Sequence, residues 1–218
     1  MFTPEKTTMI NLYTWVTPNG RKTSILLEEL GVPYVVHPVN LGKNEQFAPA
    51  FLAISPNNKI PALVDDTEDG PLSIFESGAI LTYLAEKYGR FLPASGAARY
   101  KTLEWLNWQV GGLGPMLGQL AVFEKFSKEK SPTASARFIA EADRLLTVMD
   151  KRLAESTYLA GEDYSIADIS AYPWVVTATT FLGDVLGDRI TTKPALRRWM
   201  TTIGERPAVQ RGMAVPTI

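Results

Sequence analysis

The spacing of apolar residues in this 218-residue chain changes character near residue 90. Before that point, short apolar runs typical of β-strands alternate with segments of helical periodicity. The expected strands lie at residues 9–13, 34–39, 62–64 and 72–75, and the expected helices at 18–30 and 78–88, with a short helix or loop at 46–53. The acidic residues 65–70, between the last two strands, predict a solvated turn. Alternation of this kind builds a sheet covered by helices.

The pattern after residue 97 is helical throughout. Long helical segments are expected at residues 97–126, 134–155, 166–182 and 194–205. Ser165, followed three residues later by Asp168, predicts a capping box at the start of the third of these helices. We therefore expect two domains. Residues 9–90 form a thioredoxin-like α/β domain of order β-α-β-α-β-β-α, and residues 97–215 form an all-α C-terminal domain.

The composition excludes several classes of protein. The net charge is −1, so no basic field attracts nucleic acid or an anionic membrane. No apolar run approaches the roughly 18 residues of a membrane span, and residues 1–8 lack the apolar core of a signal peptide, which favours a cytoplasmic protein. With no cysteine, the chain has no disulfide and no thiolate nucleophile. The single histidine, His37, offers no metal cluster and is expected to be structural.

Two short segments of the first domain suggest a binding site. Pro61 precedes an apolar strand, and the Ile60-Pro61 bond is a candidate for the cis form. The backbone N–H and C=O of Ile60 would then be free to pair with a ligand. Ser77 follows Glu76 at the start of the last helix of this domain, where free N–H groups favour an anion. Together these features can hold a small peptide with a free carboxylate.

This arrangement resembles the glutathione site of the glutathione transferase family. The resemblance covers nearly the whole chain and is strongest to the bacterial Nu class, which is associated with disulfide reduction. It rests on four segments: TPNG at 17–20, LGKNEQF at 41–47, ISPNNKIP at 54–61 and WQVGGLGPM at 108–116. The capping box at Ser165 and Asp168 is also typical of the family's helical domain. The family further implies glutathione as the co-substrate, no metal, and a homodimer.

The resemblance assigns the glutathione thiol to the first strand–helix turn, where Thr17 Oγ and Asn19 Nδ are candidate donors to a thiolate. Spacing alone leaves a second interpretation open, in which Thr17 only caps a helix that has Pro18 in its first turn and Asn19 is solvated. Tyr13, on the preceding strand, is expected in the core.

The other site residues follow from the same resemblance, by which glutathione contacts the Ile60 backbone. Its γ-glutamyl end is expected at Glu76 and Ser77, and its glycyl carboxylate at Gln46 and Lys59. The full expected glutathione site is Gln46, Lys59, Ile60, Pro61, Glu76, Ser77 and, reaching across the dimer, Arg137. Candidates for the second-substrate pocket are Met116, Phe123, Phe126, Tyr172 and Trp174, although aromatic residues at helical spacing also suit a core.

Three functions remain open from the sequence. The leading hypothesis is a glutathione-dependent disulfide-bond oxidoreductase, in which two glutathione molecules supply both thiols. The second is conjugation of glutathione to electrophiles, or peroxide reduction. The third is a non-catalytic protein that binds glutathione or another ligand, a hypothesis prompted by a first turn without cysteine.

Overall fold

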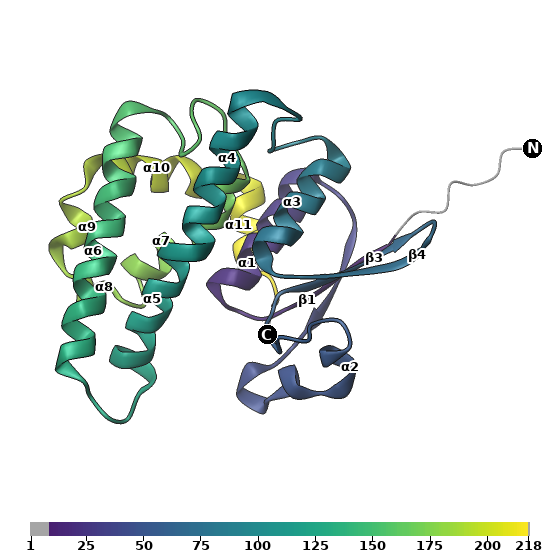
Figure 1. Cartoon of the computed structure of the whole chain (residues 1–218), viewed down its shortest axis with the longest axis horizontal. Coiled ribbons are helices and arrows are strands. Elements are labelled where there is room, and N and C mark those ends of the chain that lie inside the picture. Colours follow the sequence, from purple (N-terminus) through teal and green to yellow (C-terminus); the bar gives the residue numbers. More distant parts are fainter. Residues whose placement is uncertain (1–8, 218) are drawn as a thin grey trace, which may run out of the picture.

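A mixed four-stranded sheet forms one half of the molecule and helices form the other (Figure 1). The computed structural model describes residues 9–217, so the polar segment 1–8 lies outside the described residues. The strands are β1 (Ile10–Thr14), β2 (Tyr34–Pro38), β3 (Ala62–Thr67) and β4 (Gly70–Phe75), in the spatial order β2-β1-β3-β4. Strand β2 runs parallel to β1, and β3 and β4 are antiparallel to their neighbours. The predicted thioredoxin-like fold is confirmed.

Ile60 and Pro61 lie just before β3, outside the sheet. The Ile60-Pro61 peptide bond is cis, and the pairing of β3 with β1 and β4 begins at Ala62. Ile60 therefore stands next to the end of the ladder with its side chain only 8% exposed.

The prediction of a solvated turn at residues 65–70 is wrong for most of that segment. Strands β3 and β4 extend into it and leave only Glu68 and Asp69 between them. Asp65 is fully buried. It accepts a hydrogen bond from the Tyr83 hydroxyl at 2.7 Å and forms an ion pair with Lys87. Its acidity suggested a loop, but Tyr83 and Lys87 on the following helix bind one oxygen of the carboxylate, Oδ2, inside the fold.

Helices of the first half cover the sheet as expected. Helix α1 (Pro18–Leu30) ends at Gly31, whose φ of 70° suits a left-handed cap, and α3 (Ser77–Tyr88) begins one residue earlier than predicted. The segment expected at 46–53 contains a 3₁₀ turn at Glu45–Phe47 and the short helix α2 (Pro49–Leu52), and another 3₁₀ turn precedes it at Leu41–Lys43. His37 is structural: its ring stacks on Tyr13 at 4.5 Å, and its Nε2 lies 2.9 Å from Asn11 Oδ1.

The second half is helical throughout the described residues. Its α-helices are α4 (Gly96–Trp108), α5 (Gly114–Ala121), α6 (Pro132–Glu155), α7 (Ile166–Thr179), α8 (Gly183–Leu186), α9 (Asp188–Thr191), α10 (Pro194–Gly204) and α11 (Pro207–Met213). The single helix expected at 97–126 is interrupted by π-helical segments at Gln109–Leu113 and Val122–Phe126. Helices α8, α9 and α11 were missed, because each is too short to show a clear period. No helix within residues 9–217 has the length and apolarity needed to span a membrane.

The predicted capping box organises the centre of the helical half. Asp168 Oδ2 accepts from the Ser165 N–H at 3.1 Å, and Ser165 Oγ accepts from the Ala167 N–H at 3.3 Å. The other carboxylate oxygen of Asp168 accepts from Leu159 N at 3.0 Å and from Trp199 Nε1 at 2.8 Å. This fully buried carboxylate ties α7 to α10 and to the preceding loop.

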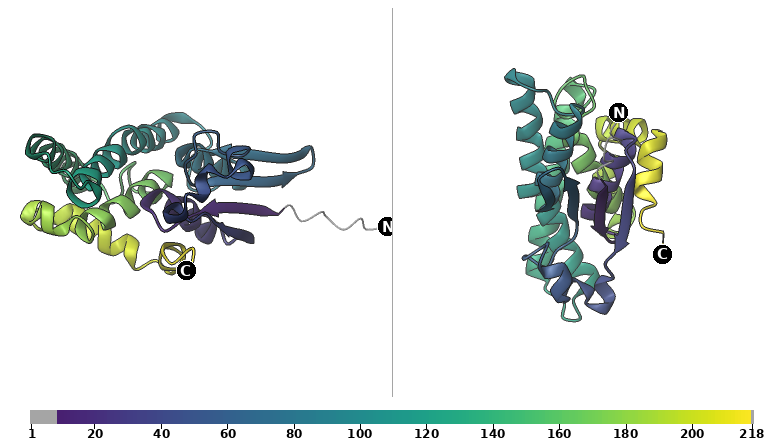
Figure 2. Two further views of the ribbon diagram at one scale, coloured as in Figure 1. Left: turned by 90° about the horizontal axis from the view of Figure 1, so that it is seen from below. Right: turned by 90° about the vertical axis from the view of Figure 1, so that its right-hand side faces the viewer.

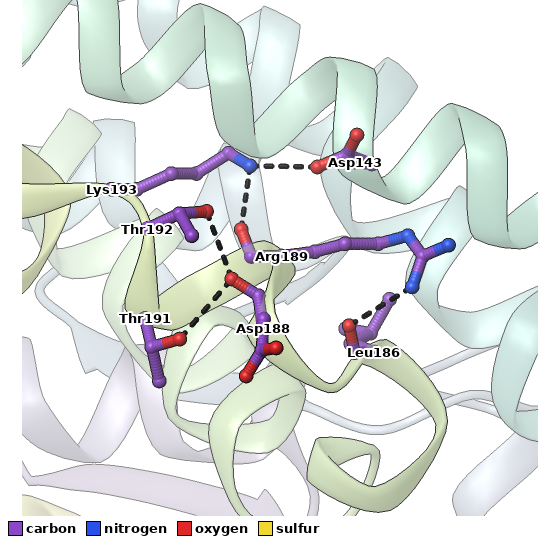
Figure 3. Close-up of polar contacts among 7 residues, drawn as sticks. All are labelled: Asp143, Leu186, Asp188, Arg189, Thr191, Thr192 and Lys193. Carbon is purple, nitrogen blue, oxygen red and sulfur yellow. Dashed lines mark hydrogen bonds and ion pairs between the residues drawn. The ribbon is translucent and has the colours of Figure 1, made fainter.

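Polar contacts connect other elements in the same way. At the far end of the helical half, Lys193 Nζ donates to Asp143 Oδ1 of α6 at 2.6 Å and to the Arg189 carbonyl at 2.5 Å (Figure 3). The last helix returns to the first half: α11 packs on α1, where Ser24 Oγ donates to the Gly212 carbonyl at 2.7 Å (Figures 1 and 2). The two halves are thus held together on the side of α1.

Candidate functional site

Two adjoining cavities lie where the sheet half meets the helical half. Their volumes are about 440 and 560 Å³, within the range of small-molecule sites. They share a wall made of Asn19, Lys59, Ile60, Gly118 and Trp174. The first cavity is further lined by residues that include Lys22, Pro61, Glu76, Ser77 and Gln109, and the second by residues that include Thr17, Arg21, Gln46, Phe126 and Phe181.

The start of α1 forms one end of the shared wall. Thr17 caps the helix, accepting from the Gly20 N–H at 3.1 Å, which leaves the hydroxyl hydrogen free to donate. A Cβ at Gly20 would lie 2.4 Å from both Thr14 Oγ1 and the Trp15 carbonyl, so only glycine lets the helix begin this close to β1. Asn19 Oδ1 accepts a hydrogen bond from Trp174 Nε1 at 2.9 Å. Thr17 is thus the N-cap of α1, a role compatible with donation to a ligand, whereas Asn19 is half-buried and bonded to Trp174 rather than solvated.

Ile60 is part of the shared wall. It lines both cavities and lies outside the sheet, because the pairing of β3 begins at Ala62. Lys59 accompanies it, its carbonyl held by Ser55 Oγ at 2.8 Å. Gln46 lines the second cavity, and its Oε1 is buried without a hydrogen-bond partner among residues 9–217. This buried acceptor can take a hydrogen bond from a ligand N–H, and the Nε2 group of the same amide can donate to a carboxylate.

Glu76 and Ser77 meet the first cavity at the start of α3. Glu76 has φ of 71°, a left-handed backbone conformation that is costly for a residue with a side chain and recurs at functional sites. The Glu76 side chain makes no capping hydrogen bond; it accepts from Asn57 Nδ2 at 3.4 Å and stays exposed. Ser77, the first residue of α3, lines the same cavity, and the start of a helix is suited to an anion.

Lys22 is the functional candidate that the sequence interpretation missed. Its side chain is 1% exposed, and Nζ donates to Gln109 Oε1 at 2.6 Å and to Ser77 Oγ at 3.2 Å. Ser170 Oγ donates to the same Gln109 oxygen. Burial lowers the pKa of Lys22 to about 7, against the opposing pull of Glu76. The spacing of Lys22 with Ile25 and Leu26 was the available signal, since it places the lysine on the buried face of α1.

The expected second-substrate residues divide into two groups. Trp174 and Phe126 line the second cavity, where Phe126 stacks on Phe181 with ring centres 5.6 Å apart. The remaining three, Met116, Phe123 and Tyr172, line neither cavity and pack among the helices instead. Helical periodicity identified their inward face but could not separate a core from a cavity.

Arg137 lies on α6, exposed, and lines neither cavity of this chain. The role expected of it belongs to an assembled pair of chains and stays a prediction. Within residues 9–217, no three His, Cys, Asp or Glu side chains gather in a metal-binding arrangement.

The fold and the cavities define a glutathione S-transferase, and the chain belongs to this family. Residues 9–86 match its N-terminal domain and residues 115–207 its C-terminal domain. The chain is 50% identical over 208 residues to the disulfide-bond oxidoreductase YfcG of Escherichia coli K12, with 94% of each chain covered.

Two solved structures resemble the whole molecule. A glutathione transferase family member from Pseudomonas fluorescens Pf-5, with two glutathione molecules bound, is 45% identical at a TM-score of 0.89, covering 94% of this chain and 92% of that one. A glutathione transferase from Pseudomonas putida, with one glutathione disulfide bound per subunit, is 40% identical at a TM-score of 0.91, covering 98% and 94%.

Proposed function

We propose that this chain is a glutathione-dependent disulfide-bond oxidoreductase of the Nu class. The observation that carries the proposal is a cysteine-free site with two adjoining cavities that meet at Asn19, Ile60 and Trp174. Two thiols can meet at such a shared wall, and neither needs to come from the protein. The relatives support this reading, because one is named a disulfide-bond oxidoreductase and others hold two glutathione molecules or glutathione disulfide.

Glutathione would lie along the shared wall. Its γ-glutamyl ammonium binds Glu76, and its α-carboxylate binds Ser77 and the start of α3, which together line the first cavity with Pro61. The cysteinyl unit pairs with the Ile60 backbone and brings the sulfur to the start of α1. The glycyl carboxylate points toward Lys59 and Gln46, and Arg137 of a second chain completes the site.

The second cavity suits an anionic disulfide. Arg21 and Lys59 bring positive charge to it, and its described lining contains no carboxylate. A second glutathione, or one half of glutathione disulfide, carries carboxylates that this charge favours.

The reaction requires a thiolate, since a free thiol of pKa about 8.5 is only a few per cent ionised at pH 7. Lowering the thiol pKa by two units means stabilising the thiolate by about 2.7 kcal/mol. Donation from Thr17 Oγ and Asn19 Nδ2, with the positive end of α1, is of the right size.

Thiol–disulfide exchange then proceeds in two steps. The bound thiolate attacks one sulfur of the disulfide, forming a mixed disulfide and releasing the other sulfur as a thiolate that takes up a proton. A second glutathione thiolate attacks the glutathione sulfur of the mixed disulfide. This yields glutathione disulfide and the second reduced thiol, so two glutathiones are oxidised for each disulfide reduced.

The same glutathione position would serve conjugation to an electrophile. The observation that favours this second function is the aromatic lining of the second cavity by Phe126, Phe181 and Trp174, which suits an apolar substrate. Glutathione would bind identically in both cases, and the second cavity would decide the reaction.

We also propose a cytoplasmic homodimer. The absence of cysteine suits a reducing compartment, in which reduced glutathione is available. The homodimer is what the family resemblance implies, and the long helices α4 and α6 are available for the pairing.

Steady-state kinetics test the proposed function directly. Glutathione-dependent reduction of a small symmetric disulfide is measured beside conjugation of glutathione to a chloronitrobenzene. Fast disulfide turnover with weak conjugation supports the oxidoreductase. The reverse pattern assigns the chain to conjugation, and no rate in either assay leaves only ligand binding.

A further inference from the structure

We infer that Trp174 is a positioning residue for the thiolate, acting by fixing the orientation of the Asn19 side-chain amide. This inference rests on the proposed function, in which Asn19 Nδ2 donates to the sulfur of bound glutathione. It concerns a residue that sequence patterns suggested only as a wall of the second-substrate pocket.

The direction of one hydrogen bond fixes the orientation of the Asn19 amide. Trp174 Nε1 lies 2.9 Å from Asn19 Oδ1. An indole nitrogen can only donate, so the amide atom that faces it must be the oxygen. Asn19 therefore turns its Nδ2 group, with two donor hydrogens, away from Trp174, and it lines both cavities from the first turn of α1.

The indole of Trp174 is held rigidly. Trp174 is 8% exposed and lies against the glycine face of α5. A Cβ at Gly114 would lie 3.1 Å from Trp174 Nε1, and a Cβ at Gly118 would lie 3.5 Å from Trp174 Cη2. These glycines are one turn apart, so the ring rests on the helix backbone itself. An indole held in this way cannot follow Asn19 if the amide rotates.

The orientation of the Asn19 amide determines whether it stabilises or destabilises the thiolate. An asparagine amide turned by 180° would present its carbonyl oxygen, rather than its amine, to the sulfur. The oxygen dipole opposes a thiolate, whereas the amine stabilises it. One hydrogen bond from α7 thus decides whether Asn19 favours or disfavours the ionised thiol. It also makes the helical half contribute to chemistry that takes place at the start of α1.

The test measures the pKa of the bound glutathione thiol in Trp174→Phe, which removes the N–H and keeps most of the ring. The chain has no cysteine, so the thiolate absorption of the complex comes from glutathione once the spectrum of the S-methylglutathione complex has been subtracted. We expect the thiol pKa to rise by about half a unit to one unit, and the pH midpoint of disulfide reduction to rise with it. The double variant Asn19→Ala/Trp174→Phe should show the same thiol pKa as Asn19→Ala alone.

Trp199→Phe is the matched control. Trp199 is also buried, and its Nε1 also donates to an acceptor oxygen, but that oxygen belongs to Asp168. This variant should lower thermal stability while leaving the thiol pKa at the wild-type value. Should Trp174→Phe not fold, Asn19→Asp gives an independent test. Trp174 would hold one carboxylate oxygen, the other would face the sulfur, and the thiol pKa would exceed that of Asn19→Ala.

Two results would overturn the inference, and they differ in whether the proposed donor role of Asn19 survives. If Asn19→Ala raises the thiol pKa but Trp174→Phe leaves it unchanged, Trp174 has no positioning role and the proposed function stands. If neither variant changes the thiol pKa, the donor role of Asn19 is wrong as well. Asn19→Asp giving a thiol pKa at or below that of Asn19→Ala would contradict the stated amide orientation.

Discussion

Replacement of the buried Lys22 by methionine should change how the stability of the protein depends on pH. Lys22 is 1% exposed, and burial lowers its pKa in the folded state to about 7. In the unfolded chain a lysine keeps its proton up to a pKa of about 10.4. At a pH between these two pKa values, folding therefore releases a proton from Lys22. The free energy of unfolding rises with pH across this range.

The magnitude follows from the number of protons released. About half a proton is released on folding at pH 7 and nearly one by pH 9, and one proton changes the free energy of unfolding by about 1.4 kcal/mol per pH unit. From pH 7 to pH 9, the gain attributable to Lys22 is about 2 kcal/mol. Lys22→Met keeps the buried length of the side chain but cannot titrate, so it loses this gain.

Urea unfolding of wild type and Lys22→Met at several pH values between 7 and 9 measures the effect. The quantity of interest is the difference in unfolding free energy between the two proteins, because groups common to both cancel. The matched control is Lys128→Met, which removes a lysine from an exposed position. A difference between wild type and Lys22→Met that stays constant across the range would refute the reasoning, because the lysine would not be exchanging its proton on folding.

Three further predictions concern the site and the fold. S-methylglutathione, whose sulfur cannot titrate, should bind about tenfold more weakly at pH 8 than at pH 6, because its carboxylate at Ser77 favours the protonated form of Lys22. Calorimetric titration at the two pH values measures the affinity. The same pH dependence of binding in Lys22→Met would contradict the prediction. Asn19→Ala should raise the pH midpoint of disulfide reduction by about one unit through loss of a donor to the thiolate, and an unchanged pH–rate profile would count against that donor. Asp168→Ala should lower the free energy of unfolding by about 3 kcal/mol or more, because it leaves the buried donors that bind this carboxylate without a partner. Asp163 is exposed, and Asp163→Ala should lower the free energy of unfolding by under about 0.5 kcal/mol. Denaturant titration of both variants measures the difference.

The fold could be predicted because its signals are local. Alternating strand and helix periods gave the order of elements in the first half, and Ser165 with Asp168 marked the start of α7 from four adjacent residues. The prediction of a solvated turn between β3 and β4 was wrong because the extent of these strands depends on residues far away in the sequence. Asp65 is buried only because Tyr83 and Lys87, on a later helix, reach its carboxylate.

The site shows the same division. The cis bond at Ile60-Pro61 was suspected from proline chemistry, and the start of α3 at Ser77 from the change of pattern. Three features join segments far apart in the chain and could not be seen in the sequence. These are the bond from Trp174 to Asn19, the contact of Lys22 with Gln109, and the shared wall of the two cavities.

The most direct test of the account is the ionisation of glutathione bound to the wild-type protein. Thiolate absorption is titrated against pH, with the S-methylglutathione complex subtracted. We predict a thiol pKa about two units below the value of about 8.5 for a free thiol, in a complex whose protein contributes no thiol of its own. A bound thiol that titrates like free glutathione would contradict the claim that the start of α1 prepares the nucleophile.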